Sequence, residues 1–402
     1  MDKLRDLVLG PERAVIVLSF TEILAWGILI YPPVLTVPHI AAAHGWSLAF
    51  CMGGLSIGLI VSGFLSPTAC GLIDRHGGNS VMSLGAIAAA VGLVGIAFAD
   101  RQPVYLACWL LVGAGMASTL YDPAFTTLTR IFGASARRQI TFVTFAGGFA
   151  STVGWPATHF LIEYLGWRGA YLVFAAVMVL VVAPLHAFAL PRVAFTAPVP
   201  VMTKTVPAER NYLLPRGTPF LLLTAGFALH AFLLSGVTSN LLAMLERGGI
   251  AAGTVVAIGA LFGPAQVLAR LADFTFAGRT SPLWVARVAV TTMVIAFTML
   301  AILGISPVVA AIFAMMFGAA NGVMTIARGA LPLVLFGPVG YGRVIGRIAR
   351  PALFLQALAP FAVASAVENL SNRTVLEIAA IGSLVALACF IAIRRPDTAA
   401  QA

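Results

Sequence analysis

The stretch Ala14 to Val37, AVIVLSFTEILAWGILIYPPVLTV, decides the fold of this 402-residue chain. Its side chains are almost all apolar, and about 20 such residues in a helix cross a hydrocarbon core roughly 30 Å thick. The stretch therefore predicts a transmembrane helix, with Glu22 about one helical turn from the bilayer midplane. A carboxylate at that depth costs roughly 2.5 to 3.5 kcal/mol, so an acid without a role should have been replaced. Glu22 is thus a candidate functional residue.

The composition extends this prediction to the whole chain. Hydrophobic residues make up 60% of it and charged residues 9%, and the mean hydropathy is +1.00. Such a composition excludes a water-soluble domain and indicates an all-α integral membrane protein. Apolar runs recur along the chain, and we expect about twelve transmembrane helices. The predicted spans are 14–37, 48–70, 80–99, 103–130, 139–163, 169–190, 218–242, 253–276, 283–304, 307–333, 349–369 and 374–393.

The formal net charge of +10 raises the question of nucleic-acid binding. The basic residues, however, gather in the loops on the side of the N-terminus, and the opposite loops hold only Arg101, Arg168, Arg247 and Arg373. This asymmetry follows the positive-inside rule and places both termini in the cytoplasm. We expect a multi-pass protein of the bacterial inner (cytoplasmic) membrane whose partners are the lipid bilayer, protons and a small-molecule substrate. Nucleic acid is not expected as a partner, and the chain is expected to be a monomer.

Sequence patterns for catalysis and cofactors are missing from the chain. There is no phosphate-binding loop, no HExxH pattern and no soluble segment long enough for an ATPase. The four cysteines lie in apolar spans without Cys-x-x-Cys spacing, which predicts neither a disulfide framework nor a metal site. Cys108 is only a candidate soft ligand. We therefore expect no enzyme and no cofactor, with a proton gradient as the energy source.

The chain divides into two similar halves. Residues 191–217 contain five prolines and four basic residues and are predicted to form a cytoplasmic linker between 1–190 and 218–402. Asp74 and Asp273 lie 199 residues apart, and Phe132 and Phe336 lie 204 apart. Each half is thus predicted to be a six-helix unit in a parallel repeat, and such repeats place a substrate site near the midplane between the halves.

The loop after the second span reads Cys70-Gly-Leu-Ile-Asp74-Arg75-His-Gly77-Gly78. It resembles the signature of the major facilitator superfamily, in which a glycine, an aspartate-arginine pair and another glycine precede basic residues. The second half keeps Asp273 and Arg279 at the matching place. The resemblance extends over essentially the whole length of the chain. It implies that these charged residues gate the transporter by locking helix ends in one conformation. A loop whose charges only fix the topology is the alternative.

Polar residues at helical spacing mark the faces of several spans, and in the family such faces line a central cavity. Asp122 lies within the fourth span, and with Glu22 it is a candidate proton carrier, since a buried carboxylate favours its neutral form. Either acid could instead neutralise Arg270 or Arg328, and these arginines could bind an anionic substrate. The candidate substrate-binding residues are Trp26, Tyr121, Thr126, Trp155, His159, His230, Gln266, Arg270, Asn321 and Arg328.

The same resemblance implies a proton-coupled secondary transporter that works by alternating access. Gly148, Gly154 and Pro156 resemble a motif typical of the family's antiporters, and the surrounding sequence is similar to that of arsenite efflux permeases and of monocarboxylate-like carriers. We predict an exporter of a toxic compound, with arsenite, antimonite or a drug as candidates. Uptake of monocarboxylates or other organic anions is the alternative. A transporter-like sensor or channel and a membrane-embedded enzyme are the competing classes.

Overall fold

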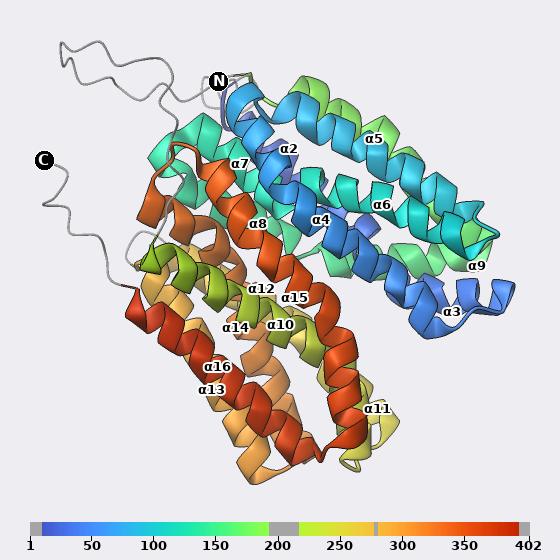
Figure 1. Ribbon diagram of the computed structural model, residues 1–402, viewed down its shortest axis with the longest axis vertical. Helices are drawn as coiled ribbons and strands as arrows, with labels where there is room; N and C mark the ends of the chain where they lie inside the picture. The colour runs from blue at the N-terminus through green and yellow to red at the C-terminus, as the bar shows by residue number, and fades with distance from the viewer. Residues whose placement is uncertain (1–9, 193–216, 277–279, 394–402) are drawn as a thin grey trace, which may run out of the picture.

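The computed structural model describes residues 10–192, 217–276 and 280–393 (Figure 1). Within these ranges the chain is helical and contains no strand. Ten of the described helices are long and apolar enough to cross a membrane. One of them, the run Gln102–Ala189, covers three of the predicted spans, so the count is consistent with about twelve. The chain is therefore an all-α, multi-pass membrane protein, as predicted.

The first half consists of helices that run from Arg13 to Ala189. Ser47 begins one of them by accepting a hydrogen bond from the Phe50 N–H, which satisfies a free donor of the first turn. The elements are α2 (Arg13–Leu29), α3 (Pro33–His44), α4 (Leu48–His76), α5 (Gly78–Ala97), α6 (Gln102–Thr119), α7 (Tyr121–Phe132), η1 (Gly133–Ala136), α8 (Arg137–Gly147), α9 (Ala150–Val177), η2 (Met178–Val182) and η3 (Leu185–Ala189).

The second half runs from Thr218 to Ala392. Three of its helices also begin at serine caps, because Ser281, Ser306 and Ser371 each accept from the N–H three residues on. The elements are α10 (Thr218–Arg247), α11 (Ala252–Ala260), α12 (Phe262–Phe276), α13 (Pro282–Leu303), α14 (Pro307–Phe336), α15 (Tyr341–Asn369) and α16 (Asn372–Ala392).

Several predicted spans were wrong in detail. The fourth is not one continuous helix, because Leu120 is extended (φ −87°, ψ −166°) and separates α6 from α7. Pro123 explains the break, since it lacks the N–H that would continue the ladder. The first span ends at Leu29 and a second helix begins at Pro33, the second residue of the Pro32-Pro33 pair. α15 begins at Tyr341, earlier than predicted, because the Asp74 carboxylate receives its first N–H groups.

Each half has its own main apolar core, and smaller clusters join the halves where they meet. One core cluster draws its buried residues from positions 25–183 and another from positions 223–393. α4 packs along α15, and α8 packs against α12 and α14. Figure 1 shows the halves together near α7 and α8 and spread apart toward α3 and α11. The boundaries 190/191 and 217/218 stay predictions, because most of the predicted linker lies outside the described residues.

Candidate functional site

The break in the fourth span presents an acid to the opposite half. Asp122 lies in the first turn of α7, and its Oδ2 is 2.7 Å from the Arg328 guanidinium on α14. The side chains are 10% and 22% exposed. Asp122 Oδ1 has no hydrogen-bond partner among the described residues. Of the pairings left open by the sequence, the structure therefore forms Asp122–Arg328, a buried ion pair between the halves.

Glu22 lies on α2 and is fully buried. The Trp26 indole N–H donates to its Oε2 at 2.9 Å, and its Oε1 has no partner in the described part of the chain. No salt bridge in the described ranges includes Glu22. An ionised carboxylate here would be a buried charge without a contacting cation, so the surroundings favour the neutral acid. The structure thus places the two candidate acids in different environments.

Arg270 on α12 is 4% exposed and donates only to neutral acceptors. Its guanidinium bonds the Gly322 carbonyl, the Gln266 side chain and, across the halves, the Thr144 carbonyl, each at 3.2 Å. Thr144 belongs to the last turn of α8, where the helix ends at Gly148. A Cβ on Gly148 would lie 2.4 Å from the guanidinium, so a larger residue here would require the Arg270 side chain to move. Arg270 carries a buried charge without a salt bridge in the described residues.

Tyr121 connects the two groups that lack an ion-pair partner. Its hydroxyl lies close to the Arg270 guanidinium. Glu22 and Tyr31 are also near enough to act on this hydroxyl through their charge. The Tyr121 ring lies 4.9 Å from the Trp26 ring, measured between centroids. Glu22, Trp26, Tyr121 and Arg270 thus form one cluster, which we call the central cluster.

The remaining candidate substrate residues lie around the central cluster at different distances. Gln266 contacts Arg270 directly, and Trp155 reaches the cluster through Tyr31, whose ring centroid is 5.7 Å away. Trp155 is 48% exposed, and His159 lies exposed one turn farther along α9. The structure therefore brings Gln266 to the cluster but leaves His159 outside it.

His230, Asn321 and Thr126 are committed to neighbouring groups. His230 is buried with its Nδ1 3.2 Å from the Met293 sulfur, and Asn321 lies beside it. Thr126 is fully buried and donates its hydroxyl to the Asp122 carbonyl at 2.7 Å. These contacts support structural roles at least as well as substrate binding.

The predicted gating residues lie at the end where the halves meet. Asp74 accepts the N–H groups of Gly342 and Arg343 at 3.0 Å each, which joins α4 to the first turn of α15. This is a favourable place for an anion, because a helix N-terminus carries partial positive charge. Arg130 donates to the Asp74 carbonyl and tightens the same contact.

The matching residues in the second half make fewer contacts than Asp74 does. Asp273 on α12 is 8% exposed. The positive charge of Arg137, at the start of α8, acts on its carboxylate. It forms no salt bridge in the described ranges. Arg75 is exposed, and Arg279 lies outside the described residues. Asp74 thus binds the first turn of a helix of the other half, whereas Asp273 has a carboxylate oxygen without a hydrogen-bond partner among the described residues.

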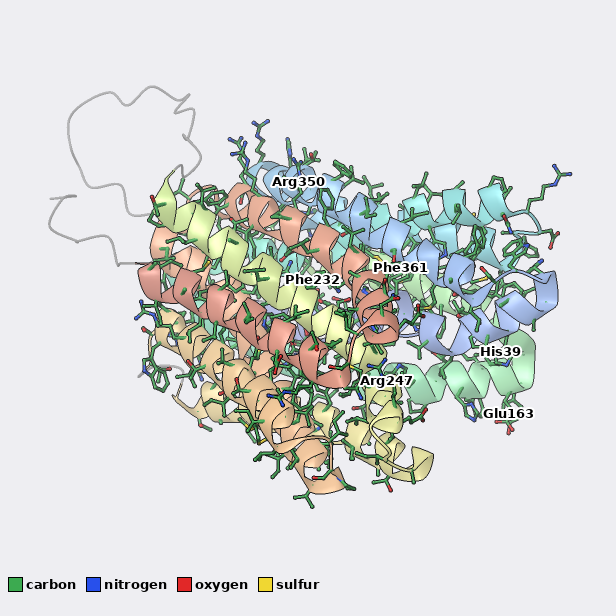
Figure 2. The ribbon with its side chains drawn as sticks, turned by 60° about the horizontal axis from the view of Figure 1, so that its bottom comes forward. His39, Glu163, Phe232, Arg247, Arg350 and Phe361 are labelled. Carbon is green, nitrogen blue, oxygen red and sulfur yellow. The ribbon has the colours of Figure 1, made fainter. Side chains whose placement is uncertain are left out.

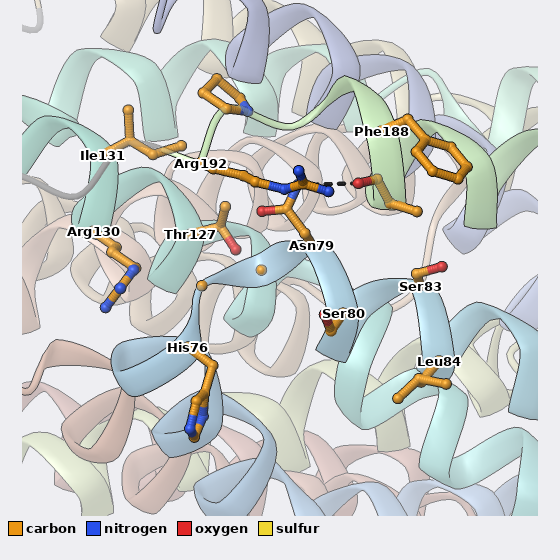
Figure 3. A pocket seen from close by; sticks show the side chains of 14 residues that line it. His76, Asn79, Ser80, Ser83, Leu84, Thr127, Arg130, Ile131, Phe188 and Arg192 are labelled. Carbon is orange, nitrogen blue, oxygen red and sulfur yellow. Dashed lines mark hydrogen bonds between the residues drawn. The ribbon is translucent and has the colours of Figure 1, made fainter.

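A polar pocket of about 460 Å³ opens at the turn between α4 and α5, within the first half (Figure 3). His76, Asn79, Thr127, Arg130 and Arg192 line it. It lies at the end of the molecule and does not include the central cluster. Cys108 also lies apart, with its sulfur packed toward Gly95 of α5. In the described chain no group of three or more His, Cys, Asp or Glu could hold a metal ion.

Sequence reasoning missed the backbone partners of the site. The Thr144 carbonyl and the room at Gly148 could be found only once α8 and α12 lay together. The helix break at Leu120 did have a signal, since Pro123 stands inside an otherwise helical pattern. The Asp122-Pro123 dipeptide could therefore have indicated a discontinuous span, a feature typical of transporter binding sites.

The fold and the buried charges define a class of protein. The molecule has two helical halves, each with its own main core, that are joined at one end. Ionisable side chains, among them Glu22, Asp122 and Arg270, are buried inside its apolar helices. Such an arrangement is typical of secondary transporters. The sequence matches the Major Facilitator Superfamily over residues 15–349, and the chain belongs to this family. It is a transporter and not an enzyme.

Relatives give narrower comparisons. The chain is 36% identical over 142 residues to "Monocarboxylate transporter 11" of Homo sapiens, which covers 34% of this chain and 29% of that protein. It is 34% identical over 131 residues to "Monocarboxylate transporter 13" of Rattus norvegicus, covering 32% and 30%. The matches thus span less than a third of these relatives. The solved structure of the human organic anion transporter MFSD10 (TETRAN) is similar with a TM-score of 0.71 at 16% identity, covering 95% and 99% of the chains.

Proposed function

We propose that this chain is a proton-coupled carrier of organic anions, with monocarboxylates as the substrate class. The observation that carries the proposal is Arg270, a buried guanidinium that contacts only neutral acceptors. A guanidinium has five N–H donors, and the three named bonds leave two of them for a substrate carboxylate. The matches to monocarboxylate transporters support the same substrate class.

Glu22 is the proposed proton carrier. It is buried without a cation, and Tyr121 separates it from the proposed carboxylate site at Arg270. Entry of an anion beside Glu22 makes ionisation of this acid less favourable, so the proton and the anion bind together. Asp122 is the second proposed carrier, but its pairing with Arg328 first requires that ion pair to open.

The proposed cycle is alternating access. The Asp74 contact with α15 holds one end closed, and release of this contact allows the halves to tilt about the central cluster. No observation on the described residues favours arsenite, antimonite or drugs over an organic anion. Export of such compounds therefore stays a prediction from the sequence.

The test replaces Arg270 in the full chain reconstituted into proteoliposomes. Wild type should take up radiolabelled lactate, pyruvate or benzoate when the outside is acidic. Arg270→Gln should lower kcat/KM about 100-fold, because a charge-assisted bond contributes about 3 kcal/mol. Arg270→Lys should retain part of the activity, since it keeps the charge but loses the planar fork.

Arg101→Gln is the matched control, because it removes an exposed arginine and should leave uptake unchanged. Uptake by Arg270→Gln at the wild-type rate would show that the guanidinium does not bind the substrate. Failure of wild type to carry any of the three acids would exclude these monocarboxylates as substrates.

A further inference from the structure

A second cationic site lies where the two halves meet, away from the central cluster. A cavity of about 400 Å³ is lined by Pro67, Thr68, Gly71, Leu72 and Arg75 of α4 and by Arg343 and Arg347 of α15. The α4 residues belong to the first half and the α15 residues to the second. Whatever occupies this cavity touches both halves.

Three guanidiniums face this cavity without a carboxylate in contact. No salt bridge among residues 10–192, 217–276 and 280–393 includes Arg75, Arg343 or Arg347. Arg343 acts on Asp74 through its charge, but Asp74 bonds the backbone of α15 and not a guanidinium. Like charges repel across the contact, so an anion between them stabilises it. Arginine forks bind phosphate oxygens in pairs, which indicates a phosphate group.

Exposed apolar side chains lie on the same two helices beside the cavity. Leu72 is 40% exposed and Phe64 is 56% exposed, and the Phe64 ring packs against Phe354 of α15 with 4.7 Å between the ring centroids. Arg75 follows Phe64 on α4 at a helical distance of roughly 16 Å, at 1.5 Å per residue. Arg350 donates to the Phe64 carbonyl at 3.3 Å and lies at the outer edge of the molecule (Figure 2).

The seam therefore has two parts: three guanidiniums at the cavity, and exposed apolar side chains at Leu72 and Phe64, beside which Arg350 adds a further cation. An inorganic anion would use only the first part, whereas a phospholipid uses both. We propose that the seam between α4 and α15 binds an anionic phospholipid, with the phosphate between Arg75, Arg343 and Arg347 and an acyl chain along Phe64 and Phe354.

This site selects a conformation of the transporter. The lining comes from both halves, so the site is complete only while α4 and α15 are in contact. A ligand shifts an equilibrium toward the state that it binds better. The bound lipid thus stabilises the arrangement in which this end is closed and the ends near α3 and α11 are apart. The inference does not depend on the proposed substrate or on proton coupling.

The first test measures the melting temperature of the purified full chain in detergent. Added dioleoyl-phosphatidylglycerol should raise it by several degrees, and phosphatidylcholine should not. The double variant Arg343→Gln/Arg347→Gln should lose about two thirds of the rise, because two of the three guanidiniums are gone. The control Arg138→Gln/Arg192→Gln removes two exposed arginines from outside the cavity and should keep the full rise.

Three outcomes would overturn the proposal. They are an equal rise in the two double variants, an equal rise with phosphatidylcholine, and a full rise with inorganic phosphate alone. Should Arg343→Gln/Arg347→Gln fail to fold, Arg343→Lys/Arg347→Lys keeps the charges. This variant should bind less phosphatidylglycerol than wild type in native mass spectrometry, because lysine lacks the bidentate fork. Equal retention of the lipid would contradict the assignment.

A second test reads the conformation by spin-label distances. Labels at Ala42→Cys in α3 and Ser371→Cys before α16 lie on exposed positions of the two halves. In nanodiscs, phosphatidylglycerol should enrich the long distance relative to phosphatidylcholine, and Arg343→Gln/Arg347→Gln should remove this difference. A distance distribution independent of the lipid would show that the site does not select a conformation.

Discussion

At the residue scale, the side chains of Glu22, Asp122, Arg270 and Arg328 divide into two kinds. Asp122 and Arg328 neutralise each other at 2.7 Å, whereas Glu22 and Arg270 contact only neutral groups. The Asp122–Arg328 pair neutralises its own charges, whereas Arg270 stays charged and can bind an anion, and Glu22 is favoured as the neutral acid. We therefore propose that Glu22 and Arg270 carry the transport chemistry and that Asp122 and Arg328 link the halves.

Glu22→Gln should separate proton coupling from substrate binding. Glutamine can still accept the Trp26 N–H but cannot carry a proton. A gradient of about one pH unit supports up to about tenfold accumulation per coupled proton, because it corresponds to about 1.4 kcal/mol. The variant should lose this accumulation in proteoliposomes while exchange of labelled substrate continues.

Glu163→Gln makes the same chemical change at an exposed position of α9 and is the control for Glu22→Gln. It should accumulate substrate as wild type does. Accumulation by Glu22→Gln at the wild-type level would move the proton site elsewhere, with Asp122 the next residue to test.

Asp122→Asn should destabilise the protein through its partner. The substitution leaves the Arg328 charge buried, which costs about 3 kcal/mol in comparable buried pairs. Thermal unfolding in detergent should show the loss, and Asp122→Asn/Arg328→Gln should recover part of it. The exposed pair Arg373–Glu377 gives the control, since Glu377→Gln should change stability by less than about 0.5 kcal/mol. Equal stability of Asp122→Asn and wild type would contradict a structural ion pair.

At the element scale, function depends on where helices break and where they approach closely. α6 and α7 separate at Leu120, so Asp122 lies in the first turn of a helix. α8 and α9 separate at Gly148 and Phe149, where Arg270 reaches the Thr144 carbonyl. α4 and α15 approach through glycines, since a Cβ on Gly346 would lie 2.6 Å from the Pro67 Cα. Small residues and proline thus set the geometry of the charged groups.

Gly346→Ala should open the seam between α4 and α15. The added methyl group meets backbone, and overpacking of this kind costs about 1 to 3 kcal/mol. The native Cys70 provides the readout, because it is fully buried and its carbonyl lies against Gly342 of α15. Its labelling by N-ethylmaleimide, followed by mass spectrometry, should rise about tenfold.

Gly53→Ala is the control. Gly53 lies on α4, the helix that carries Cys70, and a Cβ there meets nothing within 4 Å. Its Cys70 should react as slowly as in wild type. Unchanged labelling in Gly346→Ala would show that this contact does not hold the halves together.

At the scale of the whole molecule, the contact between α4 and α15 extends from Asp74, at the closed end, as far as Ser56, which donates to the Ala357 carbonyl at 3.2 Å. His39 and Glu163 of the first half and Arg247 of the second lie toward the opposite end (Figure 2). We propose that the closed end is cytoplasmic, because Arg75, Arg130, Arg343 and Arg347 gather there among the described residues.

Cysteine accessibility in intact cells tests this orientation. A membrane-impermeant maleimide should label Arg101→Cys, because Arg101 lies between α5 and α6 at the end opposite the termini. It should label Arg138→Cys only after the membrane is permeabilised. Both positions are exposed, so burial does not decide the result. The reverse pattern would place the termini outside.

Much of the fold could be predicted from local features of the sequence. Hydropathy depends on the composition of each segment, so runs such as 14–37 and 80–99 identified membrane helices without any knowledge of their neighbours. The resemblance at Asp74 and Arg75 indicated the family, and the match over residues 15–349 confirmed it. The cost of burying charge also identified Glu22, Asp122, Arg270 and Arg328 as the residues to examine.

The pairing of these charges was decided only by the tertiary structure. Asp122 and Arg328 are 206 positions apart, and Arg270 reaches Thr144 from 126 positions away. Hydropathy and helical spacing describe neighbours along one helix, but an ion pair depends on how separate helices pack and where they break. The sequence alone therefore determined which groups are buried at membrane depth. Packing between the halves determined which of them are neutralised and which are left for a proton and a substrate.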